Sequence, residues 1–302
     1  MWFWFSLIAL ICWSGSDLFS KIGCQDADDK YSHLKMVMAV GLVMGLHAAY
    51  EIFISGTGIN GSIILTYLPV SLLYISSMTI GYIGLRYIEL SISSPICNSS
   101  GALVAVLALA TGGLGELVPA QLAATALVCV GVIGLGIVEA REDDDLRAAR
   151  QQASNHRYAK SALALILPVI YCLLDALGTF ADSRVLETLN EDSANCAYEL
   201  TFLLAGIVCF VYVVLIKKSR LVPKREGPKY AGAVCETAGQ FAYIYALADT
   251  EHVALAAPII SAYCVASVLW SRIFLKEKLS WKHYAMIALV VAGIVILGIY
   301  DA

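Results

Sequence analysis

Long apolar stretches alternate with short polar ones along the whole chain of 302 residues. Each apolar stretch is about 18 to 24 residues long, enough for a helix to cross a hydrocarbon core of about 30 Å. These runs are uninterrupted, whereas a strand of a membrane barrel alternates between inward and outward residues. The pattern therefore predicts an all-α integral membrane protein with ten transmembrane helices. We expect these spans at residues 3–22, 35–53, 66–85, 91–112, 118–138, 161–181, 196–216, 230–248, 252–275 and 283–300.

Composition agrees with lipid as the main solvent of the chain. Hydrophobic residues make up 59% and charged residues 15%, and the mean hydropathy is +0.75. The first stretch lacks a basic leading region and carries Asp17 and Lys21, so we interpret it as a span and not a cleaved signal. The net charge of −4 indicates no nucleic-acid partner.

A set of landmarks occurs twice, which indicates an internal duplication. A proline, a glutamate and a Gly-x4-Gly pair recur at displacements of 161 to 163 residues, and Trp13-x3-Asp17 has a counterpart in Tyr171-x3-Asp175. The landmarks are Pro95, Glu116, Gly131 and Gly136, then Pro258, Glu277, Gly293 and Gly298. Because five spans per half is an odd number, the halves must be inverted relative to each other, as in many secondary transporters. We predict a first repeat at 1–140, a polar linker at 141–160 and a second repeat at 161–302.

Basic residues fall almost entirely on one side of the predicted membrane. Nineteen of the 20 lysines and arginines lie in the loops after spans 1, 3, 5, 7 and 9, and only Arg184 lies opposite. A missed span would scramble this alternation. The positive-inside rule predicts a multi-pass protein of the cell (inner) membrane with both termini extracytoplasmic.

Two stretches of the second half resemble a known family. His252-Val253-Ala254-Leu255-Ala256-Ala257-Pro258 and then Phe274-Leu275-Lys276-Glu277-Lys278-Leu279 closely resemble the end of an EamA-type domain of the drug/metabolite transporter (DMT) superfamily. The first half carries a looser version, from Tyr82-Ile83-Gly84-Leu85 through Pro95 to Glu116.

This resemblance implies a ten-helix carrier of two inverted repeats with a cavity lined mainly by spans 1, 3, 4, 6, 8 and 9. Members of the family carry amino acids, nucleotide-related compounds, amines, sugars and drugs, usually outward. Many relatives have both termini in the cytoplasm, whereas the basic residues of this chain predict the reverse. Spans 5 and 10 often make repeat or subunit contacts in the family, so a homodimer is one candidate assembly.

Acids within the apolar runs are the first candidates for chemistry, since a carboxylate at the centre of a bilayer costs at least about 2.5 kcal/mol. Asp17 and Asp175 each lie one helical turn from an aromatic residue, Trp13 and Tyr171. A ring face and a carboxylate together suit a substrate cation. The same acids could instead exchange protons for substrate. The structural alternative is that they cap the ends of their spans or bond a neighbouring helix.

Span 8 offers a second polar stripe, formed by Glu236, Gln240 and Tyr243. We expect it to face the cavity and, with Tyr82 and Asn98, to shape selectivity. The alternative is that Glu236 lies near the cytoplasmic end of its span. The other buried candidates, Glu199 and the pair His47 and Glu51, are better interpreted as contacts between helices.

Pro95 and Pro258 occupy equivalent positions in the two halves. A proline leaves a carbonyl without its usual donor and permits a kink, which suits a gate or hinge. Prolines near helix starts are also simply tolerated, so both interpretations stand.

Other classes of function find little support. The nine cysteines show neither CxxC nor Cys/His ligand spacing, so we predict no metal site and no cofactor. The chain has no phosphate-binding loop. We predict that the protein is not an enzyme. We predict a secondary-active exporter of a small polar or amphipathic metabolite, such as an amino acid, an amine or a drug-like compound. It would work by alternating access, with protons as the candidate coupling ion. The alternative is an uncoupled facilitator or importer of an amine or quaternary ammonium compound; a membrane-embedded enzyme or scaffold fits less well.

Overall fold

The computed structural model describes residues 1–26, 28–88, 90–111, 119–140, 162–275 and 279–301. Within these ranges the chain is helical and contains no strand, so the predicted fold class is confirmed as all-α. Glu116, Glu277 and the predicted linker 141–160 lie outside the described residues.

The helices follow the apolar stretches of the sequence, and the two longest polar interruptions coincide with the ends of helices. Their bounds are α1 Trp2–Cys24, α2 Ser32–Tyr50 with a π-turn at Glu51–Ser55, α3 Gly61–Tyr87, α4 Leu90–Cys97, α5 Ser100–Ala110, α6 Pro119–Ala140, α9 Ala162–Val185, α10 Glu191–Phe210 with a π-turn at Val211–Ile216, α11 Pro223–Leu247, a 3-10 turn at Thr250–His252, α12 Val253–Ser261, α13 Tyr263–Trp270 with a π-turn at Ser271–Leu275, and α14 Trp281–Asp301.

Eight of these described segments are long and apolar enough to cross a membrane. Residues 281–297 of α14 form a shorter apolar helix. The remaining segment, α11, is less apolar because it carries the stripe of Glu236, Gln240 and Tyr243. The molecule is thus a multi-pass membrane protein, while the count of ten crossings stays a prediction.

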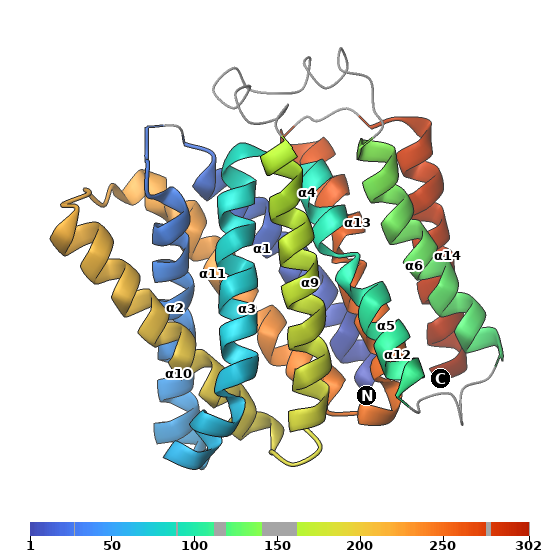
Figure 1. Cartoon of the computed structure of the whole chain (residues 1–302), viewed down its shortest axis with the longest axis horizontal. Coiled ribbons are helices and arrows are strands. Elements are labelled where there is room, and N and C mark those ends of the chain that lie inside the picture. Colours follow the sequence, from blue (N-terminus) through green and yellow to red (C-terminus); the bar gives the residue numbers. More distant parts are fainter. Residues whose placement is uncertain (27, 89, 112–118, 141–161, 276–278, 302) are drawn as a thin grey trace.

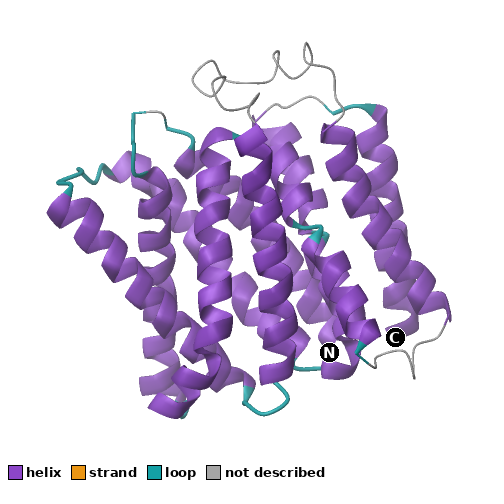
Figure 2. Ribbon diagram, viewed as in Figure 1, coloured by secondary structure: helices purple, strands orange, loops and turns teal. Residues whose placement is uncertain are grey.

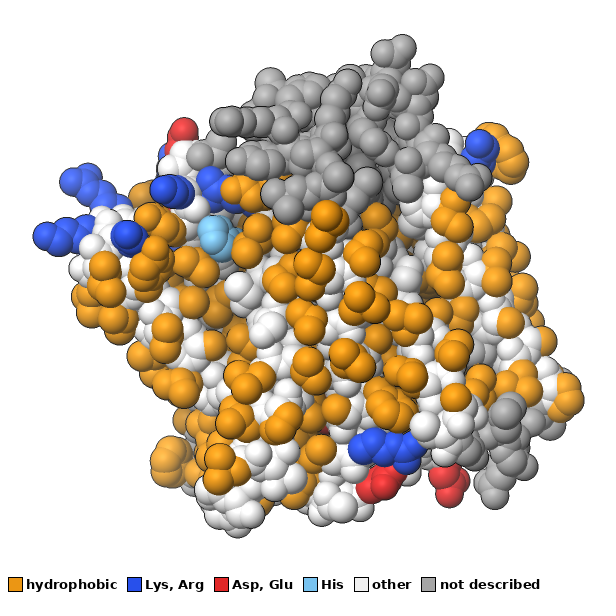
Figure 3. Space-filling view, viewed as in Figure 1, with side chains coloured by type: hydrophobic (Ala, Val, Ile, Leu, Met, Phe, Trp, Pro, Cys, Tyr) orange, Lys and Arg blue, Asp and Glu red, His pale blue; other side chains and the backbone are white. Residues whose placement is uncertain are grey.

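The outer surface is suited to lipid. Large apolar side chains such as Phe53, Leu65, Leu204 and Ile299 are more than half exposed. Hydrophobic side chains are spread over the visible face between its two ends (Figure 3). Exposed apolar surface on this scale is typical of a hydrocarbon environment and not of a water-soluble monomer.

Helices of the first half pair with helices of the second (Figure 1). The most extensive pairs are α1 with α11, α6 with α14, α2 with α10, and α3 with α9, followed by α2 with α11, α5 with α12, and α3 with α10. A two-fold relation that exchanges α1 with α9 and α3 with α11 would convert the pair of α1 with α11 into the pair of α3 with α9. This pairing matches an internal two-fold duplication, while the inverted orientation of the halves stays a prediction.

The fourth and ninth predicted spans, 91–112 and 252–275, are each interrupted close to the proline at which the sequence allows a kink. In the first, α4 ends at Cys97 and α5 begins at Ser100; in the second, α12 ends at Ser261 and α13 begins at Tyr263. Figure 2 shows the first interruption near mid-height of the bundle. Each break lies a few residues after a proline, Pro95 or Pro258, the residue type that permits a kink in a span.

Glycines bring α6 and α14 close together. A Cβ at Gly293 would lie 2.7 Å from the carbonyl oxygen of Ala124, and one at Gly131 would lie 2.9 Å from that of Met286. Backbone atoms cannot give way as a flexible side chain can. The glycines of predicted spans 5 and 10 thus pack the two halves against each other, as small residues do in membrane bundles.

Replacing Gly293 with valine is expected to lower the melting temperature of the purified protein by several degrees, because overpacking a tight contact costs about 1–3 kcal/mol. Gly227→Val is the matched control, since Gly227 is also helical but has no atom within 4 Å of its added Cβ. Equal melting temperatures for the two variants, measured by thermal unfolding in detergent, would contradict this packing.

Candidate functional site

A cavity lies at the centre of the bundle, between the two halves. Its walls come from α1, α3, α4, α5, α9, α11, α12 and α13, with Tyr198 added from α10. These are the helices of the predicted spans 1, 3, 4, 6, 8 and 9. All nine side chains proposed from the sequence as substrate-binding line this one cavity: Trp13, Asp17, Tyr82, Asn98, Tyr171, Asp175, Glu236, Gln240 and Tyr243. Their roles in binding stay a prediction.

Asp17 is held by hydroxyl groups from both halves. Its Oδ2 accepts hydrogen bonds from Ser94 of α4 at 2.5 Å and from Ser267 of α13 at 2.8 Å. Both donors are neutral, so they orient the carboxylate without cancelling its charge. The acid lies well inside α1 and does not cap its end.

Asp175 has the corresponding environment in the second half. Its Oδ2 accepts a hydrogen bond from Ser100 at 2.7 Å, at the start of α5 just beyond the interruption after Pro95. The break in the fourth predicted span therefore presents a serine to an acid of α9. Discontinuous helices of this kind form substrate and ion sites in many transporters.

Glu236 is the third carboxylate of the cavity and is only 8% exposed. Its Oε2 accepts a hydrogen bond of 2.7 Å from Ser16 of α1. Because Ser16 and Asp17 are neighbours in sequence, one turn of α1 supports two of the three acids. Three buried carboxylates around one cavity require a positive partner or protons.

Aromatic side chains are seated against glycines in a symmetric manner. A Cβ at Gly239 would lie 2.4 Å from Cδ1 of Trp13, and one at Gly81 would lie 2.9 Å from Cδ2 of Tyr171. Gly81 and Gly239 are 158 residues apart in the sequence, and the same spacing separates Trp13 from Tyr171 and Asp17 from Asp175. Each glycine thus leaves space for one aromatic ring. Trp13 occupies this space in the first half, one turn from Asp17, and Tyr171 occupies it in the second half, one turn from Asp175.

Further rings complete the aromatic wall around Trp13. Its ring centroid lies 4.9 Å from that of Tyr243 and 5.8 Å from that of Tyr263. Ring faces of this kind attract cations within about 6 Å. The cavity therefore combines aromatic surfaces with negative charge.

Replacing Gly239 with valine is expected to displace the Trp13 ring and weaken ligand binding to the cavity by about 5-fold or more, since each aromatic contact with a cation contributes about 0.5–2 kcal/mol. Isothermal titration with a stabilising amine measures the change. Gly227→Val on the same helix is the matched control, because no atom lies within 4 Å of its added Cβ. Unchanged affinity in Gly239→Val would contradict the role of the ring.

Asp182 is a fully buried acid that the sequence reasoning missed. It accepts hydrogen bonds from Tyr67 at 2.7 Å and Tyr74 at 3.3 Å, and Tyr74 also contacts the hydroxyl of Tyr243. Thr179 accepts from Tyr243 at 3.0 Å. This group, which we call the hydroxyl network, joins α3 of the first half to α9 and α11 of the second. One sequence signal could have revealed Asp182. The polar stripe of Tyr171 and Asp175 continues along α9 to Thr179 and Asp182.

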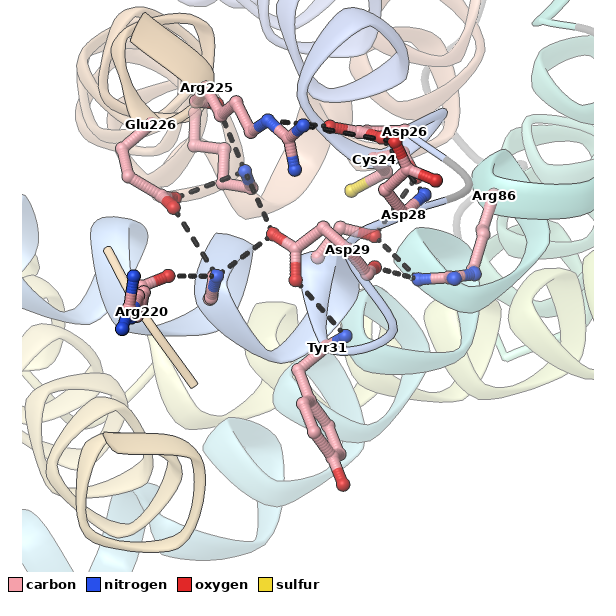
Figure 4. A network of polar contacts seen from close by, with 12 residues as sticks. Cys24, Asp26, Asp28, Asp29, Tyr31, Arg86, Arg220, Arg225 and Glu226 are labelled. Atoms are coloured by element: carbon pink, nitrogen blue, oxygen red, sulfur yellow. Dashed lines mark hydrogen bonds and ion pairs between the residues drawn. The ribbon is translucent and has the colours of Figure 1, made fainter. Parts of the chain in front are cut away.

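A second polar network lies near the other end of α3 (Figure 4). We call it the ion cluster: Asp29, Lys35, Arg86, Glu226 and Lys229. The ammonium of Lys35 lies 3.0 Å from Oδ2 of Asp29 and 3.4 Å from Oε1 of Glu226, and that of Lys229 lies 3.0 Å from Oε2 of Glu226. Arg86 donates to the carbonyl oxygen of Asp29. The cluster thus ties α2 and α3 of the first half to α11 of the second.

The helix ends place the two networks on opposite sides of the cavity. Tyr67 lies near the start of α3 and Arg86 near its end. The chain termini lie at the end of the bundle where α3 starts (Figure 1).

His47 and Glu199 form a contact between helices, as the sequence predicted. Nδ1 of His47 on α2 lies 2.8 Å from Oε1 of Glu199 on α10, and Glu51 lies 3.8 Å from Nε2 of the same ring. Neither His47 nor Glu199 lines the cavity.

The described helices form a membrane-crossing bundle around a central cavity whose walls carry three acids. Residues 162–299 match the EamA-like transporter family. The chain thus carries an EamA-like transporter domain, consistent with a membrane transporter of the drug/metabolite transporter superfamily, and the resemblance noted in the sequence is confirmed.

Solved structures extend the likeness to the whole fold. One, titled simply as the crystal structure of a protein, aligns with a TM-score of 0.64 at 12% identity, covering 98% of this chain and 96% of that one. At this identity the match concerns the fold alone. A search of the curated proteins gave no match.

Proposed function

We propose that the protein is a secondary-active transporter that exports a small, positively charged or zwitterionic metabolite by alternating access. The observation that carries this proposal is the central cavity, where three carboxylates from both halves meet aromatic faces. A membrane protein retains buried acids at the midplane where they bind substrate or carry protons. Asp17, Asp175 and Glu236 suit both tasks, so a substrate cation and protons would compete for the same oxygens.

Alternating access needs one closed connection between the halves on each side of the site. The hydroxyl network and the ion cluster are suited to these two roles, because each joins the first half to the second at its own end of the cavity. Opening one end would separate its partners while the other end stays closed. The interruptions after Pro95 and Pro258 would serve as hinges between the moving parts.

The arrangement in the membrane follows from the basic residues. We propose that the ion-cluster end faces the cytoplasm and that both termini are extracytoplasmic, in a bacterial-type inner membrane. The two repeats would be 1–140 and 161–302, and contact through the outer helices would allow a homodimer.

A second candidate is an uncoupled facilitator or importer of an amine or quaternary ammonium compound. The aromatic wall of Trp13, Tyr243 and Tyr263 supports it, because ring faces alone can hold a cation. Coupling separates the two candidates: an exchanger responds to a proton gradient, and a facilitator does not.

Flux in proteoliposomes tests the proposal. Labelled amine should accumulate several-fold against its gradient when a pH gradient is imposed, and Asp175→Asn should abolish accumulation. Glu199→Gln is the control, since Glu199 is a buried acid away from the cavity. Downhill flux that ignores the pH gradient would favour the facilitator, and absence of flux for every compound class would contradict transport.

A further inference from the structure

We propose that the cavity selects a small organic amine that also carries a neutral hydrogen-bond acceptor, and that it discriminates against free amino acids and anionic metabolites. This inference rests on the proposed transport function and narrows its substrate class. It follows from the charges that line the cavity and from three donors that lack a partner.

The charge of the cavity wall is entirely negative among the described lining residues. Asp17, Asp175 and Glu236 supply carboxylates, and no lysine, arginine or histidine lines the cavity. Lys21 lies on the same helix as Asp17, but its ammonium donates to the carbonyl oxygens of Leu85 and Ile88. A substrate carboxylate or phosphate would therefore meet three like charges and no opposite one.

The acids leave room for an ammonium group. The serine hydroxyl groups that orient Asp17 and Asp175 all bond Oδ2. These serine bonds do not use Oδ1 of either aspartate, so Oδ1 is the oxygen that we expect a ligand to contact. An ammonium has three donors and suits two or three carboxylate oxygens at once.

Three buried donors of the wall have no hydrogen-bond partner within the described part of the chain. They are the hydroxyl of Ser20, the hydroxyl of Tyr82 and Nε2 of Gln240. Buried polar groups in folded proteins are normally satisfied. A neutral ligand oxygen would satisfy such donors without adding negative charge, whereas a purely hydrocarbon amine would leave them unpaired.

The aromatic wall sets the remaining preference. Trp13 and Tyr243 have ring centroids 4.9 Å apart, and Tyr171 lies one turn from Asp175. These faces accommodate a flat apolar body attached to the cation. A hydroxylated arylalkylamine combines all three features, so tyramine is a suitable probe.

Four matched compounds test the inference by isothermal titration of the purified protein: tyramine, phenethylamine, L-tyrosine and tyrosol. Tyramine should bind at least about 10-fold more tightly than tyrosine, which adds a carboxylate, and than tyrosol, which lacks the amine. Phenethylamine, without the hydroxyl, should bind with intermediate affinity. Binding of tyrosine or tyrosol as tight as that of tyramine, or no binding by either amine, would overturn the assignment.

Two variants separate the contributions. Tyr82→Phe keeps the ring but removes one unpaired hydroxyl, so it should narrow the difference between tyramine and phenethylamine; Asp175→Asn should weaken both amines together. Flux in liposomes distinguishes this inference from the transport proposal. Amine binding without flux would refute transport alone, and flux of an amino acid without amine binding would refute the substrate class alone.

Discussion

Glu236→Gln is expected to reduce amine transport by about 30-fold or more while the protein remains folded. Glu236 is nearly buried, contacts Ser16 of the other half, and adds the third negative charge to a cavity with no basic lining residue among those described. Truncating one partner of a buried charged contact costs about 2–5 kcal/mol, and each 1.4 kcal/mol is a factor of ten in affinity. Glutamine preserves the shape of the side chain, so the loss reports the charge.

Initial rates of labelled amine uptake into proteoliposomes measure this effect. Glu226→Gln is not a suitable control because it belongs to the ion cluster; Glu187→Gln is, because that glutamate lies on the exposed surface beside Arg184. A Glu236→Gln variant that transports at the rate of Glu187→Gln would show that the third carboxylate takes no part in transport.

Lys229→Met is expected to destabilise the closed ion cluster strongly. The Lys229 side chain is 1% exposed and lies 3.0 Å from Glu226 and 3.8 Å from Asp29. Removing one member of a buried ionic network costs about 3–5 kcal/mol, because Glu226 loses its 3.0 Å partner and must share Lys35 with Asp29. The melting temperature should fall by several degrees or more, and far more than for Lys224→Met, an exposed lysine of the same helix.

A double variant distinguishes loss of a charge pair from simple damage to packing. Lys229→Met combined with Glu226→Gln removes charges of both signs, so it should recover part of the melting temperature lost in the single variant. Purely additive losses would contradict the ionic role of Lys229.

The sequence predicted much of the site because the relevant patterns are local. The spacing of Trp13 and Asp17, repeated in Tyr171 and Asp175, places an aromatic ring and an acid on one helical face. Because the chain is duplicated, this pattern of ring and acid occurs in both halves. The apolar runs located the helices for the same reason, since a membrane demands length and hydropathy from each segment separately.

The remaining features depend on contacts between distant segments, which no local pattern encodes. The partner of Asp17, Ser267, is 250 positions away, and serine is common in any helix. Lys35 and Lys229 looked like ordinary topology signals, yet the fold buries both against acids. Asp182 drew no prediction, because its tyrosine partners lie on another helix, α3.

A structure of the protein determined with tyramine bound tests the central claim most directly. The account predicts ligand density in the cavity between the halves, with the amine within hydrogen-bond distance of at least one oxygen of Asp17, Asp175 or Glu236. Density for the ligand only outside this cavity, with these three carboxylates unaltered, would contradict it.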